Sequence, residues 1–206
     1  MRLRQLIEDG LRYFQVQYNE QTIADIIYYV EELEKWNKHI NLVGLKNAEA
    51  VVRVLLYDAF FVDRFIKGSR TVLDLGSGAG VLAIPVKILN SDMSVISVDK
   101  NMKKIQFQRH IARRLHLKDF TTLHGKIEEL DAVEVDTLLV KAFGGMKTIF
   151  EKGGRHVREG GRALMMKTDR DEPVDAEGFV LEETIPYRLP LSEKALRIFI
   201  YNKKVS

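Results

Sequence analysis

A glycine-rich segment lies between two acidic residues near the middle of the chain. Asp74 precedes residues 76–80, which read Gly-Ser-Gly-Ala-Gly, and Asp99 follows nineteen residues after the last of these glycines. Glycines let the main chain approach a ligand closely, and an acid after the next apolar run can accept hydrogen bonds from ribose hydroxyls. The spacing therefore predicts a nucleoside-binding site in a βαβ unit.

The position of the first acid separates this loop from a dinucleotide-binding loop. Dinucleotide enzymes use G-x-G-x-x-G beneath a pyrophosphate, whereas Asp74 stands two residues before a G-x-G-x-G run. A ligand without phosphate but with a charged amino-acid end needs main-chain contacts and a nearby carboxylate, so we expect Asp74 to hold an ammonium group and Asp99 a ribose. The pattern resembles motif I of S-adenosylmethionine-dependent methyltransferases. A simple strand-to-helix turn is the alternative interpretation.

Basic residues cluster in the segment that follows Asp99. At helical pitch Lys103, Arg109 and Arg113 fall largely on one side, away from the apolar Phe107 and Ile111. Such a stripe is typical of a nucleic-acid-binding helix, although a solvated helix face is the more common cause of such runs. The total of 32 basic and 29 acidic residues, a net charge of +3, decides little about partners.

Composition limits the protein to a few classes. A chain of 206 residues is long enough for one α/β domain with a modest appendage. The absence of cysteine excludes disulfides and thiolate metal sites, and residues 1–10 lack the pattern of a secretion signal. No apolar run is long enough for a membrane span. We expect a monomeric cytoplasmic protein without a metal site.

The elements that must position these residues follow from hydrophobic periodicity. Residues 1–67 are predicted to form an N-terminal helical cap, interrupted at residues 36–44, and residues 68–206 an α/β domain. Alternation of strands and helices predicts a mainly parallel sheet with helices on both faces, closed by an antiparallel hairpin. The predicted strands are residues 71–75, 95–98, 120–123, 137–140, 163–167, 179–185 and 196–201.

Taken together, these segments resemble the RsmG/GidB family, the small-subunit ribosomal RNA guanine-N7 methyltransferases. The Trp-Asn-Lys block at residues 36–38 and the Ile84-Pro85 pair after the glycine loop are fairly specific, whereas the loop alone fits any class I methyltransferase. The shared blocks are residues 35–38, Asn41-Leu42, residues 74–80, Ile84-Pro85, Asp99, Lys103-Lys104, residues 125–129, residues 140–143 and Lys167.

The resemblance implies a class I S-adenosylmethionine methyltransferase fold, Rossmann-like with a seven-stranded mainly parallel sheet. It further implies methyl transfer from S-adenosylmethionine to guanine N7 of 16S ribosomal RNA, with that RNA or the small ribosomal subunit as partner. Lys126 and Lys141 would face the reaction site. The cofactor-binding residues implied are Asp74, Gly76, Ser77, Gly78, Gly80, Asp99, Lys126, Ile127 and Glu128.

Two lysines are expected at the carboxyl edge of the sheet, where open α/β folds bind their ligands. Lys141 ends the fourth predicted strand and is the candidate catalytic residue, expected to contact the base edge or a phosphate. Lys167 ends the fifth predicted strand. It is expected to bind RNA together with Lys103, Arg109 and Arg113. Guanine N7 has a free lone pair and no proton to lose. Positioning and electrostatics should therefore suffice, without a general acid or base.

The chain departs from the family pattern at four places. Lys126 and Lys141 stand where arginine is usual, residues 81–83 read Val-Leu-Ala before Ile-Pro, and the segment leading to Asp58 lacks a histidine. Arginine and lysine differ in bidentate recognition, which bears on the RNA target. The alternatives are a methyltransferase acting on a small molecule or a protein, and a non-catalytic RNA-binding module with a degenerate cofactor site.

Overall fold

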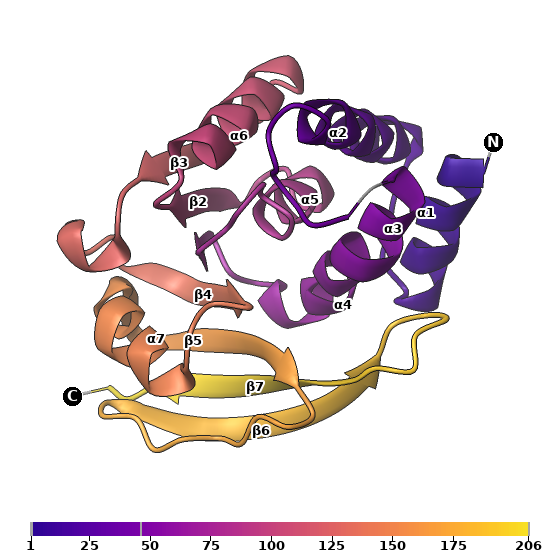
Figure 1. Ribbon diagram of the computed structural model, residues 1–206. Helices are drawn as coiled ribbons and strands as arrows, with labels where there is room; N and C mark the ends of the chain where they lie inside the picture. The colour runs from indigo at the N-terminus through magenta and orange to yellow at the C-terminus, as the bar shows by residue number, and fades with distance from the viewer. Residues whose placement is uncertain (1, 46, 206) are drawn as a thin grey trace.

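The apolar runs of the second part of the chain form a seven-stranded sheet of order β3-β2-β1-β4-β5-β7-β6. The computed structural model describes residues 2–45 and 47–205. Strands β1 to β5 are parallel, and β7 lies antiparallel between β5 and β6 (Figure 1). The strands are β1 (Thr71–Leu75), β2 (Ser94–Asp99), β3 (Phe120–His124), β4 (Val135–Lys141), β5 (Val157–Thr168), β6 (Phe179–Arg188) and β7 (Ala195–Lys203).

Each predicted strand is confirmed, and so is the closing antiparallel hairpin of β6 and β7. The strand ends differ most in β5, which begins at Val157 instead of Ala163. Residues 158–160 are exposed, while residues 163–166 are buried. Apolar periodicity reports burial, so it marked only the buried half of this strand.

Helices cover both faces of the sheet, as predicted (Figure 1). On one face lie α5 (Ala83–Leu89), α6 (Met102–Arg114) and the N-terminal helices; on the other lie α7 (Met146–Gly153) and the short η3 (Gly154–His156). Consecutive residues of β1 serve opposite faces, because Val72 belongs to the first apolar cluster and Leu73 to the second. This double burial is typical of parallel sheets.

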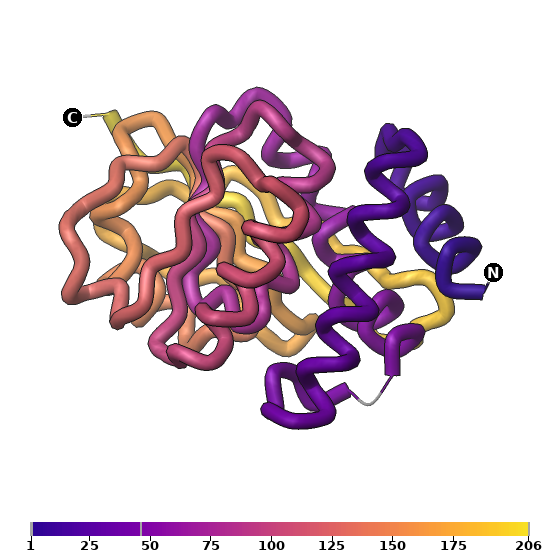
Figure 2. Tube along the Cα trace, turned by 90° about the horizontal axis from the view of Figure 1, so that it is seen from above, coloured from indigo at the N-terminus to yellow at the C-terminus, as the bar shows by residue number. Residues whose placement is uncertain are grey.

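The N-terminal segment is helical and shares one apolar core with the sheet. Helix α2 begins after Asn19, whose side chain forms a capping box with Thr22. Figure 2 shows the N-terminal helices together at one end of the molecule. The elements are α1 (Arg2–Tyr13), α2 (Glu20–Asn37), α3 (Ala48–Val51), η1 (Val52–Leu56) and α4 (Tyr57–Ile66).

The apolar part of this segment that follows the predicted interruption at residues 36–44 does not form one regular helix. Residues Val52–Leu56 form a π-helical stretch, η1, in which the Tyr57 N–H bonds to the Val52 carbonyl five residues earlier. Stretches of this kind often lie at functional sites. Val54, within this stretch, is 44% exposed and lies beside the site described below.

Aromatic packing joins α4 to the C-terminal hairpin. The rings of Phe61 and Tyr187 are stacked, with centroids 3.9 Å apart and an interplanar angle of 14°. Chain segments distant in sequence therefore close around the first apolar cluster. No helix within residues 2–45 and 47–205 has the length and apolar character needed to cross a membrane.

Candidate functional site

The glycine loop, residues 76–80, leaves the carboxyl end of β1 and leads toward α5. The main-chain N–H groups of Gly76 and Ser77 donate to the Val98 carbonyl at 2.9 and 3.0 Å, which ties the loop to β2. Its three glycines have φ between +60° and +75°. This left-handed region is unfavourable for residues with a Cβ, so the backbone shape depends on glycine.

Buried side chains support this loop from behind. Gln108 of α6 donates to the Gly78 carbonyl at 2.7 Å and to the Ser77 hydroxyl at 2.9 Å. Tyr29 of α2 donates to the Ala79 carbonyl at 3.1 Å. The loop is therefore fixed by both the sheet domain and the N-terminal helices.

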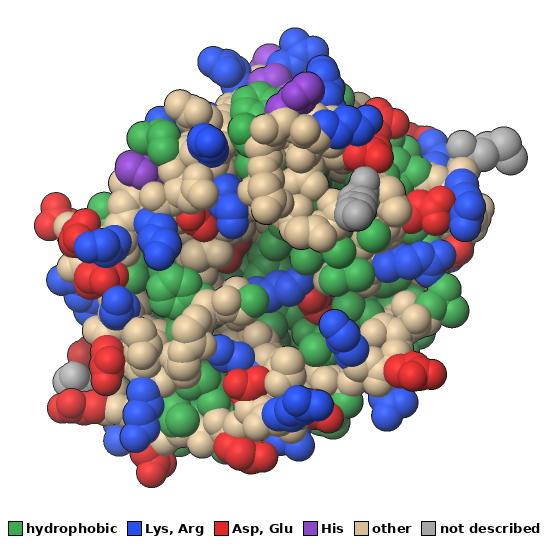
Figure 3. Space-filling model, in the orientation of Figure 1, with side chains coloured by type: hydrophobic (Ala, Val, Ile, Leu, Met, Phe, Trp, Pro, Cys, Tyr) green, Lys and Arg blue, Asp and Glu red, His purple; other side chains and the backbone are tan. Residues whose placement is uncertain are grey.

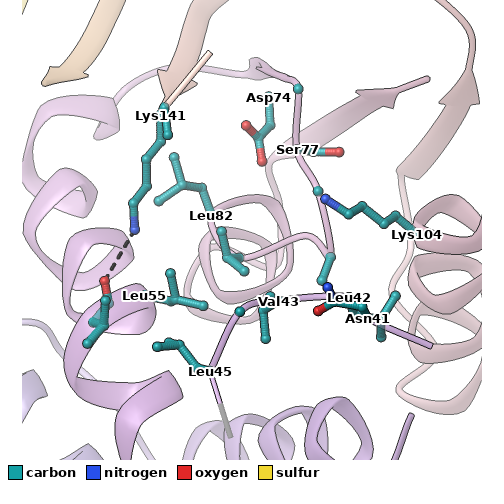
Figure 4. A pocket seen from close by; sticks show the side chains of 17 residues that line it. Asn41, Leu42, Val43, Leu45, Leu55, Asp74, Ser77, Leu82, Lys104 and Lys141 are labelled. Carbon is teal, nitrogen blue, oxygen red and sulfur yellow. Dashed lines mark hydrogen bonds between the residues drawn. The ribbon is translucent and has the colours of Figure 1, made fainter. Parts of the chain in front are cut away.

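Two cavities of about 540 and 520 Å³ open beside the loop, and Gly76 and Lys104 line both. We name them the Lys141 cavity and the Asp99 cavity. The Lys141 cavity is lined by residues 41–45, Val54, Leu55, Asp74, residues 76–79, Val81, Leu82, Lys104, Lys141 and Ala142 (Figure 4). The Asp99 cavity is lined by Leu75, Gly76, residues 98–101, Lys104, residues 125–128, Phe143 and Lys152.

Asp99 is fixed at the end of β2 by two main-chain donors. Its Oδ2 accepts from the Gly78 N–H and its Oδ1 from the Asn101 N–H, both at 2.8 Å. Each carboxylate oxygen keeps a further lone pair for a ligand. Asp99 is thus a rigid acceptor that can take hydroxyl groups inside the cavity.

The opposite wall of the Asp99 cavity is the short helix η2 (Ile127–Glu129). Ile127 is buried and supplies apolar surface. Arg155 fixes this turn by donating to the carbonyls of Glu128, at 3.1 Å, and Leu130. The Glu128 carboxylate pairs with Lys152 at 2.8 Å, and this contact lowers the pKa of Glu128.

Lys126 lies exposed at the rim of the Asp99 cavity, where it pairs with Glu129 at 2.9 Å. Lys141, its predicted companion, lines the other cavity. The structure therefore does not bring these two lysines together in one cavity.

Asp74 is a buried carboxylate at the wall of the Lys141 cavity, only 2% exposed. It accepts from the Ala83 N–H at 3.1 Å. Burial raises the pKa of Asp74 to about 7, more than the hydrogen bond from Ala83 lowers it. A cationic group bound beside it would favour the ionised form.

The far wall of the Lys141 cavity is the loop of residues 41–45, shaped by Asn37. The Asn37 Oδ1 accepts from the Leu42 and Val43 N–H groups at 2.8 and 2.9 Å, and its Nδ2 donates to the Leu45 carbonyl at 2.8 Å. Figure 4 shows this loop across the cavity from Asp74. The asparagine of the Trp-Asn-Lys block therefore has a structural role, because its side chain fixes the loop of residues 41–45.

Lys141 reaches from the end of β4 toward η1 and α4 (Figure 4). Its Nζ lies 2.6 Å from Oδ2 of the buried Asp58 and donates to the Val54 carbonyl at 3.4 Å. Tyr187 donates to the other carboxylate oxygen at 2.8 Å. The lysine is therefore held at the cavity by residues from two other elements.

Gly80 lines neither the Lys141 cavity nor the Asp99 cavity. A Cβ there would come within 2.7 Å of Ile84 Cδ1, and its φ is +75°. In this structure Gly80 permits the turn and the close packing of α5, while Gly76 and Gly78 face the cavities.

The predicted RNA-binding residues of α6 are exposed and lie outside the two cavities. Arg109 donates to the Thr122 hydroxyl at 3.0 Å, whereas Lys103 and Arg113 project into solvent. Lys167 donates to the Gly144 carbonyl at 2.7 Å, in the loop after β4. Figure 3 shows further lysine and arginine side chains around the hollow on this face.

Three residues that lie at the site were given no role there by the sequence patterns: Lys104, Asp58 and Tyr187. Lys104 lines both cavities. It follows Asp99 by five positions and lies in the first turn of α6, so its closeness to Asp99 in the sequence could have predicted a place at the site. Asp58 and Tyr187 meet across 129 positions, and no local pattern connects them. Within residues 2–45 and 47–205, no group of three or more His, Asp or Glu side chains could hold a metal ion.

The sheet order and the glycine loop at the end of β1 define the class I S-adenosylmethionine methyltransferase fold. An O-methyltransferase from Bacillus cereus in complex with SAH superposes with a TM-score of 0.62 at 16% identity, covering 86% of this chain and 91% of that chain. A SAM-dependent methyltransferase from Aquifex aeolicus gives 0.56 at 16% identity, covering 73% and 92%.

Sequence comparison identifies the family within this class. The GidB family model, described as rRNA small subunit methyltransferase G, matches residues 22–184. The ribosomal RNA small subunit methyltransferase G of Geotalea uraniireducens (strain Rf4) is 32% identical, over 97% of this chain and 96% of that protein. That of Syntrophotalea carbinolica is 32% identical, over 90% and 91%. The chain belongs to this family.

Proposed function

We propose that this protein transfers a methyl group from S-adenosylmethionine to guanine N7 of 16S ribosomal RNA. The observation that carries the proposal is the pair of cavities that meet at Gly76, one containing Asp99 and the other containing Asp74 and Lys141. The Asp99 cavity can hold a nucleoside. The Lys141 cavity offers the Asp74 carboxylate for the charged end of the cofactor and the Lys141 cation for the target base. The family membership supports the same substrate.

The residues present fit this cofactor. Asp99 is a fixed acceptor for ribose hydroxyls, and Ile127 and Phe143 supply apolar surface for an adenine ring. Asp74 offers a carboxylate for the ammonium of the amino-acid end, and bare glycines admit the ligand to the main chain. When bound, the cofactor supplies an electrophilic methyl group on a positively charged sulfur.

The target base needs to be positioned, and no proton needs to be removed. With the cofactor held by Asp99 and Asp74, guanine N7 would take the methyl group with its own lone pair, the sulfur would keep the electrons of the broken carbon–sulfur bond, and the positive charge would pass to the base. The guanine edge carries two acceptors, N7 and O6. Lys141 can donate to O6 and leave N7 free to react, which is electrostatic positioning without acid–base catalysis.

Four basic residues outside the two cavities are proposed to bind RNA. Lys103, Arg109, Arg113 and Lys167 would contact RNA phosphates and fix the orientation of the substrate. Lys126 would contact the cofactor from the rim of the Asp99 cavity. We also propose a cytoplasmic monomer, with residues 1–67 as a helical cap on the methyltransferase domain of residues 68–206.

The proposal is tested by incubating the protein with labelled S-adenosylmethionine and small ribosomal subunits or 16S RNA that lack the modification. The expected result is label on RNA, with the modified base mapped as N7-methylguanine. The Asp99→Ala variant serves as the control for a reaction that depends on the Asp99 cavity. Label confined to protein or small molecules, or label at another base position, would contradict the proposal.

A further inference from the structure

Asp58 is a buried carboxylate placed behind the Lys141 cavity. Its side chain is 4% exposed, and its Oδ2 lies 2.6 Å from Lys141 Nζ. The other oxygen accepts from Tyr187 at 2.8 Å. Burial and the Asp58 carboxylate raise the pKa of Tyr187, so the phenol stays protonated and donates.

These contacts fix an otherwise flexible side chain. Lysine has four rotatable methylene links and a compact charge that can adopt many positions. Here the ammonium is held by Asp58 and by the Val54 carbonyl at 3.4 Å. An ammonium has three N–H donors, and these two contacts leave one for a ligand.

The charge of Asp58 matters as well as its position. Methylation at N7 uses the lone pair of the base without loss of a proton, so positive charge grows on guanine. A lone ammonium beside O6 would repel that charge in a site of low dielectric. The pair of Lys141 and Asp58 has no net charge, so it can donate a hydrogen bond without this repulsion.

We propose that Asp58 is a positioning residue, which holds the Lys141 ammonium at the cavity with one N–H left for the substrate and balances its charge during methyl transfer. This inference rests on the proposed function. Tyr187 assists by donating to the second oxygen of Asp58.

A purely structural role is the competing explanation. Buried ion pairs are poor stabilisers compared with apolar packing, because desolvation offsets most of the attraction. Phe61 and Tyr187 already join α4 to β6 through their stacked rings. The carboxylate therefore has more to contribute to Lys141 than to the attachment of the helix.

The test is a double-mutant cycle with Asp58→Asn, Lys141→Gln and the double variant, assayed on the RNA substrate. We expect Asp58→Asn to lower kcat about 10- to 100-fold, as for loss of a hydrogen bond to a charged group, with little change in KM for RNA or in cofactor affinity. In the Lys141→Gln background the same change should lower kcat less than about twofold, because the two residues act as one unit.

Asp63→Asn is the matched control. Asp63 is also buried on α4, 4% exposed, but it accepts from Asn90 and not from Lys141. It should leave kcat close to the wild-type value even if it lowers the melting temperature. An equal loss of kcat in the Asp63 variant would make the effect one of helix packing, and would overturn the inference.

Two further results are informative. If Asp58→Asn fails to fold, Tyr187→Phe is the substitute, because it keeps the Asp58 carboxylate. It should lower kcat by a few-fold in the wild-type background and leave kcat unchanged in the Lys141→Gln background. A kcat that is unchanged in both backgrounds, or lowered equally in both, contradicts the inference. Full additivity of the first cycle contradicts it too. A wild-type protein that does not methylate RNA would instead overturn the proposed function, and this inference with it.

Discussion

The Phe143 ring lies directly over Gly76, so closely that a Cβ on Gly76 would come within 2.5 Å of the ring atom Cδ2. Gly76 also has φ +69°, which a residue with a Cβ adopts at a cost of about 1–2 kcal/mol. We therefore expect Gly76→Ala to lower the melting temperature and to weaken S-adenosylmethionine binding at least tenfold. Calorimetry and thermal unfolding measure the two effects.

Gly145→Ala is the matched control for this substitution. No atom lies within 4 Å of a Cβ on Gly145, and its φ is negative. Its melting temperature and cofactor affinity should stay near those of the wild type. A Gly76 variant that binds cofactor as tightly as Gly145→Ala would show that the main chain at Gly76 does not contact the ligand.

Asp99→Asn should weaken cofactor binding while leaving the fold intact. Both carboxylate oxygens accept main-chain N–H groups, from Gly78 and Asn101, whereas an asparagine side chain keeps only one acceptor oxygen and carries no charge. Loss of hydrogen bonds to a charged group predicts a rise in Kd of about 10- to 100-fold. Titration calorimetry measures this change.

Asp131 is exposed and lines neither cavity, so Asp131→Asn serves as the control for a carboxylate-to-amide change. Its Kd should match the wild-type value. An Asp99→Asn protein with unaltered affinity would show that the cofactor ribose binds elsewhere.

The sequence was sufficient for features that repeat along the chain. Burial on both faces makes the central strands continuously apolar, so the seven strands and the final hairpin could be predicted. The glycine loop was also predictable, because a strand, three glycines with positive φ and a distant acid form one local unit. Asp99 and Gly76 therefore lie where the spacing indicated.

Features made by long-range contacts were not predictable from local patterns. Asp58 meets Tyr187 and Lys141 only after α4, β4 and β6 have packed together. Gly80 has the residue type and φ of the other loop glycines, yet it lies against Ile84 and lines neither cavity. The π-helical turn at Val52–Leu56 inserts within an apolar series that reads as a regular helix.

Asp74 should make the free energy of unfolding fall as pH rises, whereas an acid with a lowered pKa in the folded state makes it rise. Burial raises its pKa to about 7 in the folded protein, while the unfolded chain ionises near 3.8. Between these values the folded state holds a proton that the unfolded state has released, so stability falls as pH rises through this window. Asp74→Asn should therefore raise the melting temperature relative to wild type more at pH 8 than at pH 5.

Asp136→Asn provides the contrast for this pH effect. Burial raises the pKa of Asp136, but hydrogen bonds from Arg158, Thr71 and Arg70 outweigh it and hold the pKa at about 2. Its replacement should lower the melting temperature similarly at pH 5 and pH 8, because the wild-type group is ionised at both. Equal effects of Asp74→Asn at the two pH values would contradict a raised pKa.

The same carboxylate predicts how cofactor affinity responds to pH. An ammonium beside Asp74 binds better to the ionised form, so affinity for S-adenosylmethionine should rise from pH 5 to pH 7 in the wild type, a range in which the ligand keeps its ammonium. Asp74→Asn should bind more weakly and lose this dependence. A variant that keeps the wild-type pH profile would assign the dependence to another group and remove Asp74 from the cofactor site.

The basic face of α6 predicts a salt-dependent contribution to RNA binding. Lys103 and Arg113 are exposed and outside the cavities, so their replacement by glutamine should spare cofactor affinity. Removing one cation that binds a phosphate should reduce the slope of log Kd against log salt by roughly one through counterion release, so the double variant Lys103→Gln with Arg113→Gln should reduce it by roughly two. Exposed Lys67 and Lys194, changed to glutamine together, are the control with the same change in charge. If both double variants change the slope equally, the effect is one of net charge, and α6 carries only a solvated face.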